Sequence, residues 1–311
     1  MTISAFSKFL RSNPKIEERI EEVMKLCTES STLLEEKCQE LQNLIVKSSI
    51  ESNVVEKIKK NMEQTFGSDF ENAILAVRSS AVGEDSADAS GAGQMSTFLG
   101  VKGFDDVIDK IKQCWASHFG FRAVQYRRQL CTSMDNQMAV VVQKLVKAEV
   151  AGVLFTRHPD TGSVNHAIIN ASYGLGESVV SGEVHPDSIS VIENGNGQLQ
   201  IDYDAIGEKA TVYRADDQGG LVEEEIAAGD QCCLSKPDIE RLYRIGKAVE
   251  QIFGSARDIE FALSQGNIYI LQARPITTSD NEENWELIQE FDSAMVSSDE
   301  WVTSANVQYV L

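Results

Sequence analysis

Four polar side chains near the end of the chain recur at a spacing that would place them on one face of a β-hairpin. The segment ARDIEFALSQGNIYILQARPI carries Asp258 and Glu260 in its first half, and Gln272 and Arg274 in its second half. Successive residues of a strand point to opposite faces, so each pair shares one side of its strand. A three-residue loop at 264–266 would bring all four onto one face, whereas a two-residue loop would break that arrangement.

The apolar residues of the same hairpin are expected on its other face. Ile259, Phe261 and Leu263 alternate with the two acids, while Tyr269 and Leu271 alternate with the glutamine and the arginine. The polar face would then carry two carboxylates, an amide oxygen and a guanidinium. Magnesium prefers hard oxygen ligands, and a guanidinium donates two hydrogen bonds to phosphate, so this set suits a magnesium-bound polyphosphate. The alternative is a solvated face with a surface ion pair.

A second candidate site follows the apolar residues of the segment AILAVRSSA. Arg78 stands at the edge of the polar stretch VGEDSADASGAGQMSTFLG, in which Gly91 and Gly93 would expose backbone N–H groups and Thr97 would supply a hydroxyl. Such groups can cradle phosphates. The stretch has neither the GK[ST] of a Walker A loop nor the GxGxxG of a Rossmann fold, and a plain linker is the alternative.

These residues must be positioned by a mixture of helices and strands. Apolar residues at three- and four-residue spacing predict helices between Lys15 and Gln64, between Asp105 and Arg128, and over 236–253. For the last helix, Ser235 is the expected N-cap and Gly254 the expected stop. Strands are predicted for the segments AILAVRSSA, MAVVVQKLV, VAGVLFTRHP and DSISVIEN, and for both halves of the hairpin.

Composition excludes several classes of function. The 311 residues, 42% of them hydrophobic, can bury a sizeable core, and no apolar run is long enough to cross a bilayer. A net charge of -20 opposes binding to nucleic acid or to anionic membranes. The six cysteines and four histidines lack the spacing of a zinc site, and the thiols are expected to be reduced. We therefore expect a cytoplasmic protein with no nucleic-acid or membrane partner.

Four blocks in order resemble one known family. VRSSAVGEDSADASGAGQMSTFLGV, QKLVKAEVAGVLFTRHPDTG, ASYGLGESVVSGEVHPDS and DIEFALSQGNIYILQARPIT are similar to the ATP-grasp domain of the phosphoenolpyruvate synthase, pyruvate phosphate dikinase and rifampicin phosphotransferase group. The resemblance implies an α+β ATP-grasp fold, incomplete at its N-terminus, with antiparallel sheets and packed helices. It predicts a helical segment at 1–70, the nucleotide-binding domain at 71–280, and the start of a linker at 281–311.

In that family a terminal phosphate of ATP passes to a histidine on a separate swivelling domain, which delivers it to pyruvate or to a drug hydroxyl. The resemblance implies that Arg78 and Arg274 are catalytic residues that bind phosphate. It also implies that Gly93 and Thr97 hold the phosphates from the loop. Phosphoryl transfer requires mainly positioning and charge neutralisation, and residues of these types supply both.

The same resemblance implies an adenine site and a metal site. Gln143 would lie at the adenine, with Leu145 and Val146 lining the hinge. The GLGE segment at 174–177 is expected to shape the backbone and not to contact the ligand.

The implied cofactors are ATP and Mg²⁺. Glu260 and Gln272 would be the metal and phosphate ligands, and Asp258 a further acidic residue at the metal.

Two departures from the family leave an alternative open. Nothing before Ala73 resembles the segment that carries the family's ATP-binding lysine, and the phosphohistidine and acceptor domains are not found in this sequence. The first expectation is an ATP-binding part of a phosphotransferase that serves a small-molecule acceptor through a phosphohistidine domain. The alternative is an inactive ATP-grasp remnant that acts as a binding or regulatory module.

Overall fold

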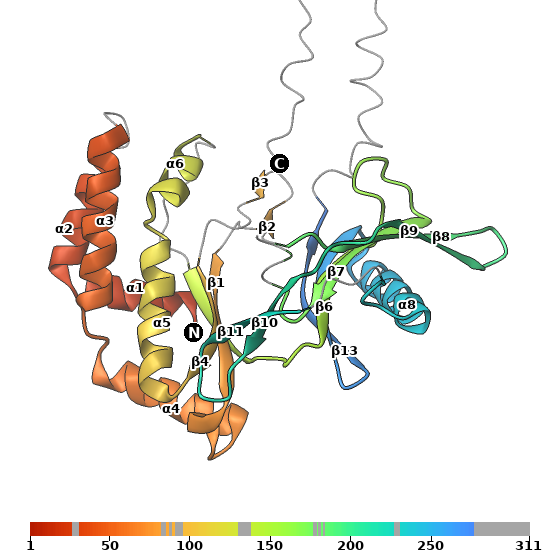
Figure 1. Ribbon diagram of the computed structural model, residues 1–311. Coiled ribbons are helices and arrows are strands. Elements are labelled where there is room, and N and C mark those ends of the chain that lie inside the picture. Colours follow the sequence, from red (N-terminus) through yellow and green to blue (C-terminus); the bar gives the residue numbers. More distant parts are fainter. Residues whose placement is uncertain are drawn as a thin grey trace, which may run out of the picture.

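Two antiparallel sheets lie side by side, with helices on their outer faces (Figure 1). The computed structural model describes residues 1–26, 31–81, 85–86, 89–90, 96–129, 138–176, 179, 182, 184–226 and 231–276. Helices and antiparallel strands together confirm the α+β class. Among the described residues, no helix is both long enough and apolar enough to cross a bilayer.

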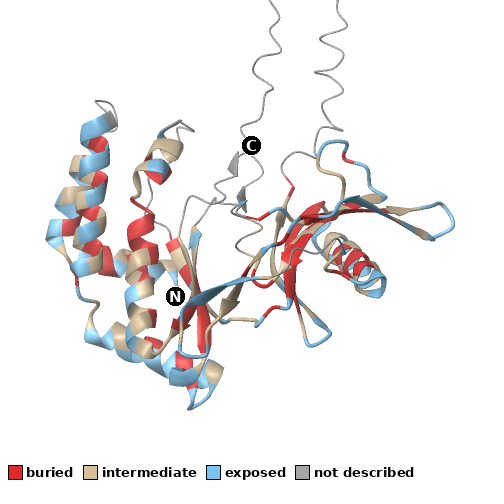
Figure 2. Cartoon of the chain, viewed as in Figure 1, coloured by how far each residue is buried: buried red, intermediate tan, exposed pale blue. Residues whose placement is uncertain are grey.

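The first sheet has three strands in the order β4-β1-β5, namely Thr97–Lys102, Ile74–Ala81 and Met138–Lys144. Its outer face packs against α1 (Ile3–Arg11) and α5 (Phe104–Ser117). Behind α5 lies α3 (Ser31–Lys47), and the same hydrophobic core includes α2 (Pro14–Leu26), α4 (Ser52–Phe66) and α6 (Phe121–Gln129). Leu75 and Val77 of β1 and Trp115 of α5 are fully buried in this core. The ring of Trp115 stacks on that of Phe6, with 5.6 Å between the ring centroids. In Figure 2 the buried parts of the chain (red) lie along the strands of this sheet and on the inner sides of the helices, while the outer sides of the helices are mostly exposed (pale blue).

The second sheet has six strands in the order β13-β12-β6-β7-β8-β9. They are Asn267–Pro275, Arg257–Ser264, Val150–Phe155, His166–Tyr173, Asp187–Glu193 and Leu199–Ala205. Its outer face is covered by α8 (Lys236–Phe253), where Ile239 and Leu242 pack against Ile259 and Phe261. The apolar outer face of each sheet therefore packs against helices, and polar side chains can lie on the inner faces.

Short connecting elements complete the described chain. A 3₁₀ turn, Phe70–Asn72, precedes β1, and the short strands β2 (Asp85–Ser86) and β3 (Ala89–Ser90) pair within the loop that follows it. The strands β10 (Thr211–Ala215) and β11 (Leu221–Glu225) form a separate hairpin.

Local sequence signals placed some elements correctly and others not. The helix α8 is confirmed with its predicted ends, since Ser235 accepts a hydrogen bond from the Asp238 N–H and Gly254 has a φ of 76°. The helix predicted from Asp105 to Arg128 is instead two helices, because the chain tightens and turns before Gly120, and glycine is a poor helix former. The strands β7, β9, β10 and β11 were not predicted. Nor were β2, β3 and β4, because β2, β3 and the first half of β4 lie in the polar stretch that was expected to be a loop.

A buried ion pair joins Asp187, the first residue of β8, to Lys209, which follows β9. Asp187 and Lys209 have fully buried side chains and form a salt bridge. The Asp187 carboxylate also accepts hydrogen bonds from the N–H groups of Gly207 at 2.9 Å and Cys233 at 2.7 Å. Burial alone would raise the pKa of Asp187, but the Lys209 ammonium and these donors outweigh it and hold the pKa below its ordinary value.

We expect Lys209→Met to lower the free energy of unfolding by about 3–5 kcal/mol at pH 7, because it leaves a buried carboxylate without its counter-charge. A group with a depressed pKa stabilises the fold above its unfolded pKa and loses that contribution as the pH falls through the folded value. The difference between the variant and the wild type should therefore shrink below about pH 4. Urea unfolding at several pH values measures both effects, and a difference independent of pH would contradict the assignment.

Candidate functional site

The two inner sheet faces meet at Arg78. This side chain projects from β1, and its Nη2 donates to Glu260 Oε2 at 2.8 Å and to Gln272 Oε1 at 2.6 Å, on β12 and β13 of the other sheet. The Arg78 and Glu260 side chains are about one-fifth exposed, so water screens the pair only in part. The structure thus brings together an arginine and two oxygen donors that lie more than 180 residues apart in sequence.

The second arginine of the site is held within the hairpin. Arg274 donates from Nε and Nη2 to Asp258 Oδ2, each at 2.7 Å, and Asp258 lies opposite it in the strand pairing. The same pairing places Glu260 opposite Gln272. Cross-strand partners share a face, so the predicted grouping of these four side chains is confirmed.

The loop that was expected to produce this grouping is different. The turn has two residues, Gln265 and Gly266, both with positive φ (51° and 72°), as a type I′ turn requires. The register shifts between Glu260 and Phe261. Phe261 pairs with Ile270 and Glu260 pairs with Gln272, so Leu271 is an extra residue on β13. This β-bulge restores the register that a two-residue turn alone would break.

The two-residue turn and the bulge together place two apolar side chains on the face opposite to the predicted one. Leu271 packs with Ala262 and with the linker residues Leu145 and Val146 on the inner side of the sheet, and Tyr269 lies opposite Ala262. The prediction that Leu271 and Tyr269 share the outer face was wrong, because the two-residue turn sets Tyr269 opposite Ala262 and strict alternation fails at the bulge that contains Leu271. Leu271 was therefore missed as a candidate site residue.

The remaining predicted residues lie on the three-stranded sheet or just after it. Arg78 is inside β1, which continues to Ala81, and not at a loop edge as expected, while Thr97 begins β4 and pairs with Arg78. Gln143 on β5 is opposite Ala76, two residues before Arg78, and so shares its face. Gly93 lies outside the described residues.

The linker between β5 and β6 is where the two sheets join. Leu145 and Val146 follow β5 directly and pack against a small cluster that includes Ala151 and Leu175 of the second sheet's side. The Leu145 N–H donates to the Ile74 carbonyl at 3.0 Å, which fixes the start of the linker on β1. The inner faces therefore have an apolar end at the linker and a charged end at Arg78.

The family of the pyruvate phosphate dikinase AMP/ATP-binding domain matches residues 1–295. The chain belongs to this family. The match agrees with the expected ATP-grasp architecture and includes the helices before residue 71, while the domain boundary predicted at residue 70 stays a prediction. The family description supports ATP as a ligand of the domain.

The relatives that the chain matches are much longer than the chain itself. It is 37% identical to phosphoenolpyruvate synthase of Pyrococcus furiosus over 286 residues, which cover 88% of this chain and 35% of the relative. It is 40% identical over 210 residues to the prodigiosin synthesizing transferase PigC of Serratia marcescens, covering 67% of this chain and 23% of the relative. For the uncharacterized phosphotransferase YvkC of Bacillus subtilis the identity is 39% over 216 residues, covering 67% and 25%. The chain thus spans well under half the length of these relatives.

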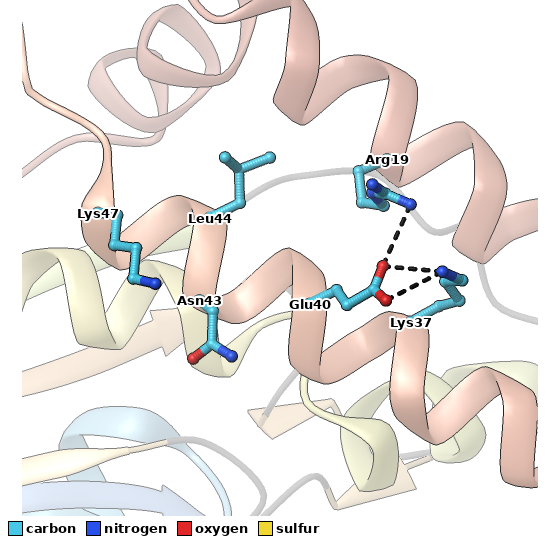
Figure 3. A pocket seen from close by; sticks show the side chains of 6 residues that line it. All are labelled: Arg19, Lys37, Glu40, Asn43, Leu44 and Lys47. Carbon is cyan, nitrogen blue, oxygen red and sulfur yellow. Dashed lines mark hydrogen bonds and ion pairs between the residues drawn. The ribbon is translucent and has the colours of Figure 1, made fainter.

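An open pocket of about 460 Å³ on the outer helices lies apart from the candidate site at Arg78. It lies against α2 and α3 and is lined by Arg19, Lys37, Glu40, Asn43, Leu44 and Lys47 (Figure 3). Glu40 accepts ion pairs from Arg19 at 3.2 Å and Lys37 at 2.8 Å, so it neutralises much of the positive charge there. With one leucine in its lining, this pocket offers little apolar wall to a nucleotide base.

We expect Glu260→Gln to lower the free energy of unfolding of the nucleotide-free protein by about 1 kcal/mol, since a charge-assisted bond to Arg78 becomes a neutral one. Chemical denaturation measures the change. Glu224→Gln is the matched control, because its pair with Arg214 is nearly half exposed and should contribute under ~0.5 kcal/mol. Equal effects of the two substitutions would show that Arg78 does not hold Glu260 in solution.

Proposed function

We propose that this chain is the ATP-binding part of a phosphotransferase that passes a phosphoryl group from Mg-ATP to a histidine on a swivelling domain. The observation that carries the proposal is the convergence of Arg78 from one sheet with Glu260 and Gln272 from the other. These are the charges and oxygen donors that a metal-bound triphosphate needs on its two sides. The intact set does not favour the alternative of an inactive remnant, and a cytoplasmic setting is part of the proposal.

The donor set fits Mg²⁺. Among the described residues, no group of three or more His, Cys, Asp or Glu side chains could hold a metal alone. Magnesium at nucleotide sites usually takes one or two carboxylates together with phosphate oxygens. Glu260 and Gln272, with Asp258 beside them, would supply the protein's oxygens, and the bound ion would neutralise charge on the phosphates.

Arg78 is proposed to exchange partners when the nucleotide enters. In the structure its guanidinium donates to the oxygens of Glu260 and Gln272. A divalent ion at those oxygens would replace that guanidinium, which would then turn to the phosphates, where Thr97 and Gly93 are proposed to add a hydroxyl and an N–H donor. Arg274 would hold the phosphates from the hairpin side, still oriented by Asp258.

The adenine is proposed to lie at the apolar end of the inner faces. Leu145, Val146 and Leu271 come from the linker and the bulge and would form its walls, and Gln143 would offer an amide for the ring edge. Flat apolar walls with a few polar groups are typical of nucleotide pockets. The ribose would then lie between this apolar end and Arg78.

The phosphoryl acceptors are proposed to lie in other domains. Two of the relatives are named as a prodigiosin synthesizing transferase and a phosphotransferase, and the third as a phosphoenolpyruvate synthase, so the names differ in product while two of them state group transfer. We therefore assign to this chain the activation of ATP and to a separate phosphohistidine domain the delivery to a small molecule.

We expect Arg274→Ala to remove about half or more of the thermal stabilisation that Mg-ATP gives the wild type. A ligand at one hundred times its Kd stabilises by about 2.7 kcal/mol, and loss of a charge-assisted phosphate contact should weaken binding roughly tenfold to a hundredfold. Thermal unfolding with and without Mg-ATP measures the effect, and calorimetry in EDTA should show binding that is much weaker than with magnesium.

Arg19→Ala is the matched control, since it removes an arginine from the outer helical pocket. It should leave the stabilisation by Mg-ATP unchanged. If Arg19→Ala abolishes binding while Arg274→Ala retains it, the nucleotide lies on the outer helices and the proposed site is wrong.

A further inference from the structure

The tip of the β10–β11 hairpin reaches across to the three-stranded sheet (Figure 1). The Gly220 N–H donates to the Gly100 carbonyl on β4 at 2.7 Å. A Cβ on Gly100 would stand 2.3 Å from the Gly220 oxygen, and the φ of Gly100 is 74°. The contact thus depends on glycine, because the two backbones approach more closely than a side chain allows.

The base of the same hairpin is attached to the six-stranded side. The Leu175 N–H, just after β7, donates to the Tyr213 carbonyl at 2.9 Å. A Cβ on Gly174 would be 2.4 Å from that carbonyl oxygen, so glycine is required here too. This explains the glycine of the GLGE segment as a backbone-shaping residue. The hairpin is therefore a strap (residues 211–225) with one end on each sheet.

The tip of the strap also contacts the linker between the sheets. The Asp217 carboxylate accepts an ion pair from Lys147, and the Asp217 carbonyl accepts a hydrogen bond from Lys102 Nζ at 2.7 Å. From the other side, the Ser264 hydroxyl donates to the Lys147 carbonyl at 2.7 Å. The linker at 145–149 is thus held between the tip of the strap and the β12–β13 turn.

We infer that Asp217 is a positioning residue for nucleotide binding, acting through Lys147 to fix the linker and the separation of the two sheets. The inference rests on the proposed function, because it gives the linker residues Leu145 and Val146 their role at the adenine. The Asp217–Lys147 pair is mostly exposed, so it adds little to the stability of the fold. An exposed ion pair contributes up to about 1 kcal/mol, and a free energy of this size is enough to shift the population of a binding-competent arrangement severalfold.

The test is Asp217→Asn, with Glu224→Gln as the matched control on the same hairpin. Glu224 pairs with Arg214, and both residues belong to the strap, so this pair does not join the strap to the linker. We expect Asp217→Asn to raise the Kd for Mg-ATP about threefold to fivefold without changing the melting temperature of the nucleotide-free protein. Amide hydrogen exchange over 145–149 should become faster in this variant, and the control should match the wild type in all three measurements.

Gly100→Ala provides a stronger perturbation of the same contact, with an expected rise in Kd of about tenfold if it folds. Unchanged Kd and unchanged exchange at 145–149 in Asp217→Asn would overturn the inference whatever Gly100→Ala does. If the wild type does not bind Mg-ATP, the proposed function fails. Hydrogen exchange then still decides whether Asp217 holds the linker, because it needs no nucleotide.

Discussion

The arrangement of this protein depends on the contact of one guanidinium with two oxygen donors across two sheets. Arg78 leaves a strand whose other face is packed into a helical core, so its side chain can only enter the space between the sheets. There it meets Glu260 and Gln272. A partly buried charge needs a partner, and these two groups stabilise the Arg78 guanidinium.

The positions of those partners follow from the way each sheet uses its faces. The outer face of the hairpin places Ile259 and Phe261 against α8, and this packing directs Glu260 inward. On the second strand the bulge at Leu271 compensates for the short turn and keeps Gln272 opposite Glu260. The same bulge places the Leu271 side chain at the linker end of the inner faces. One irregularity in β13 therefore positions residues at both ends of the proposed site.

Sequence reasoning succeeded where the signal was local. The ends of α8 were predicted because Ser235 and Gly254 are capping residues, and the shared face of Asp258 and Glu260 follows from the two-residue period of a strand. The bulge at Leu271 could not be predicted, because it depends on the register between two strands and on packing against the linker. The strap was missed because both of its strands have only five residues and β11 is exposed and acidic, and because the contacts that attach its tip are with residues more than 100 positions away.

The central claim, that Arg78 contacts the hairpin across the two sheets, is tested most directly by a double-mutant cycle. Arg78→Met, Gln272→Met and the double variant would be unfolded in denaturant without nucleotide. A coupling energy of about 1 kcal/mol or more is predicted, as measured for side chains in direct contact. Effects that add to within about 0.5 kcal/mol would contradict the account, since they would mean that the two side chains do not meet in solution.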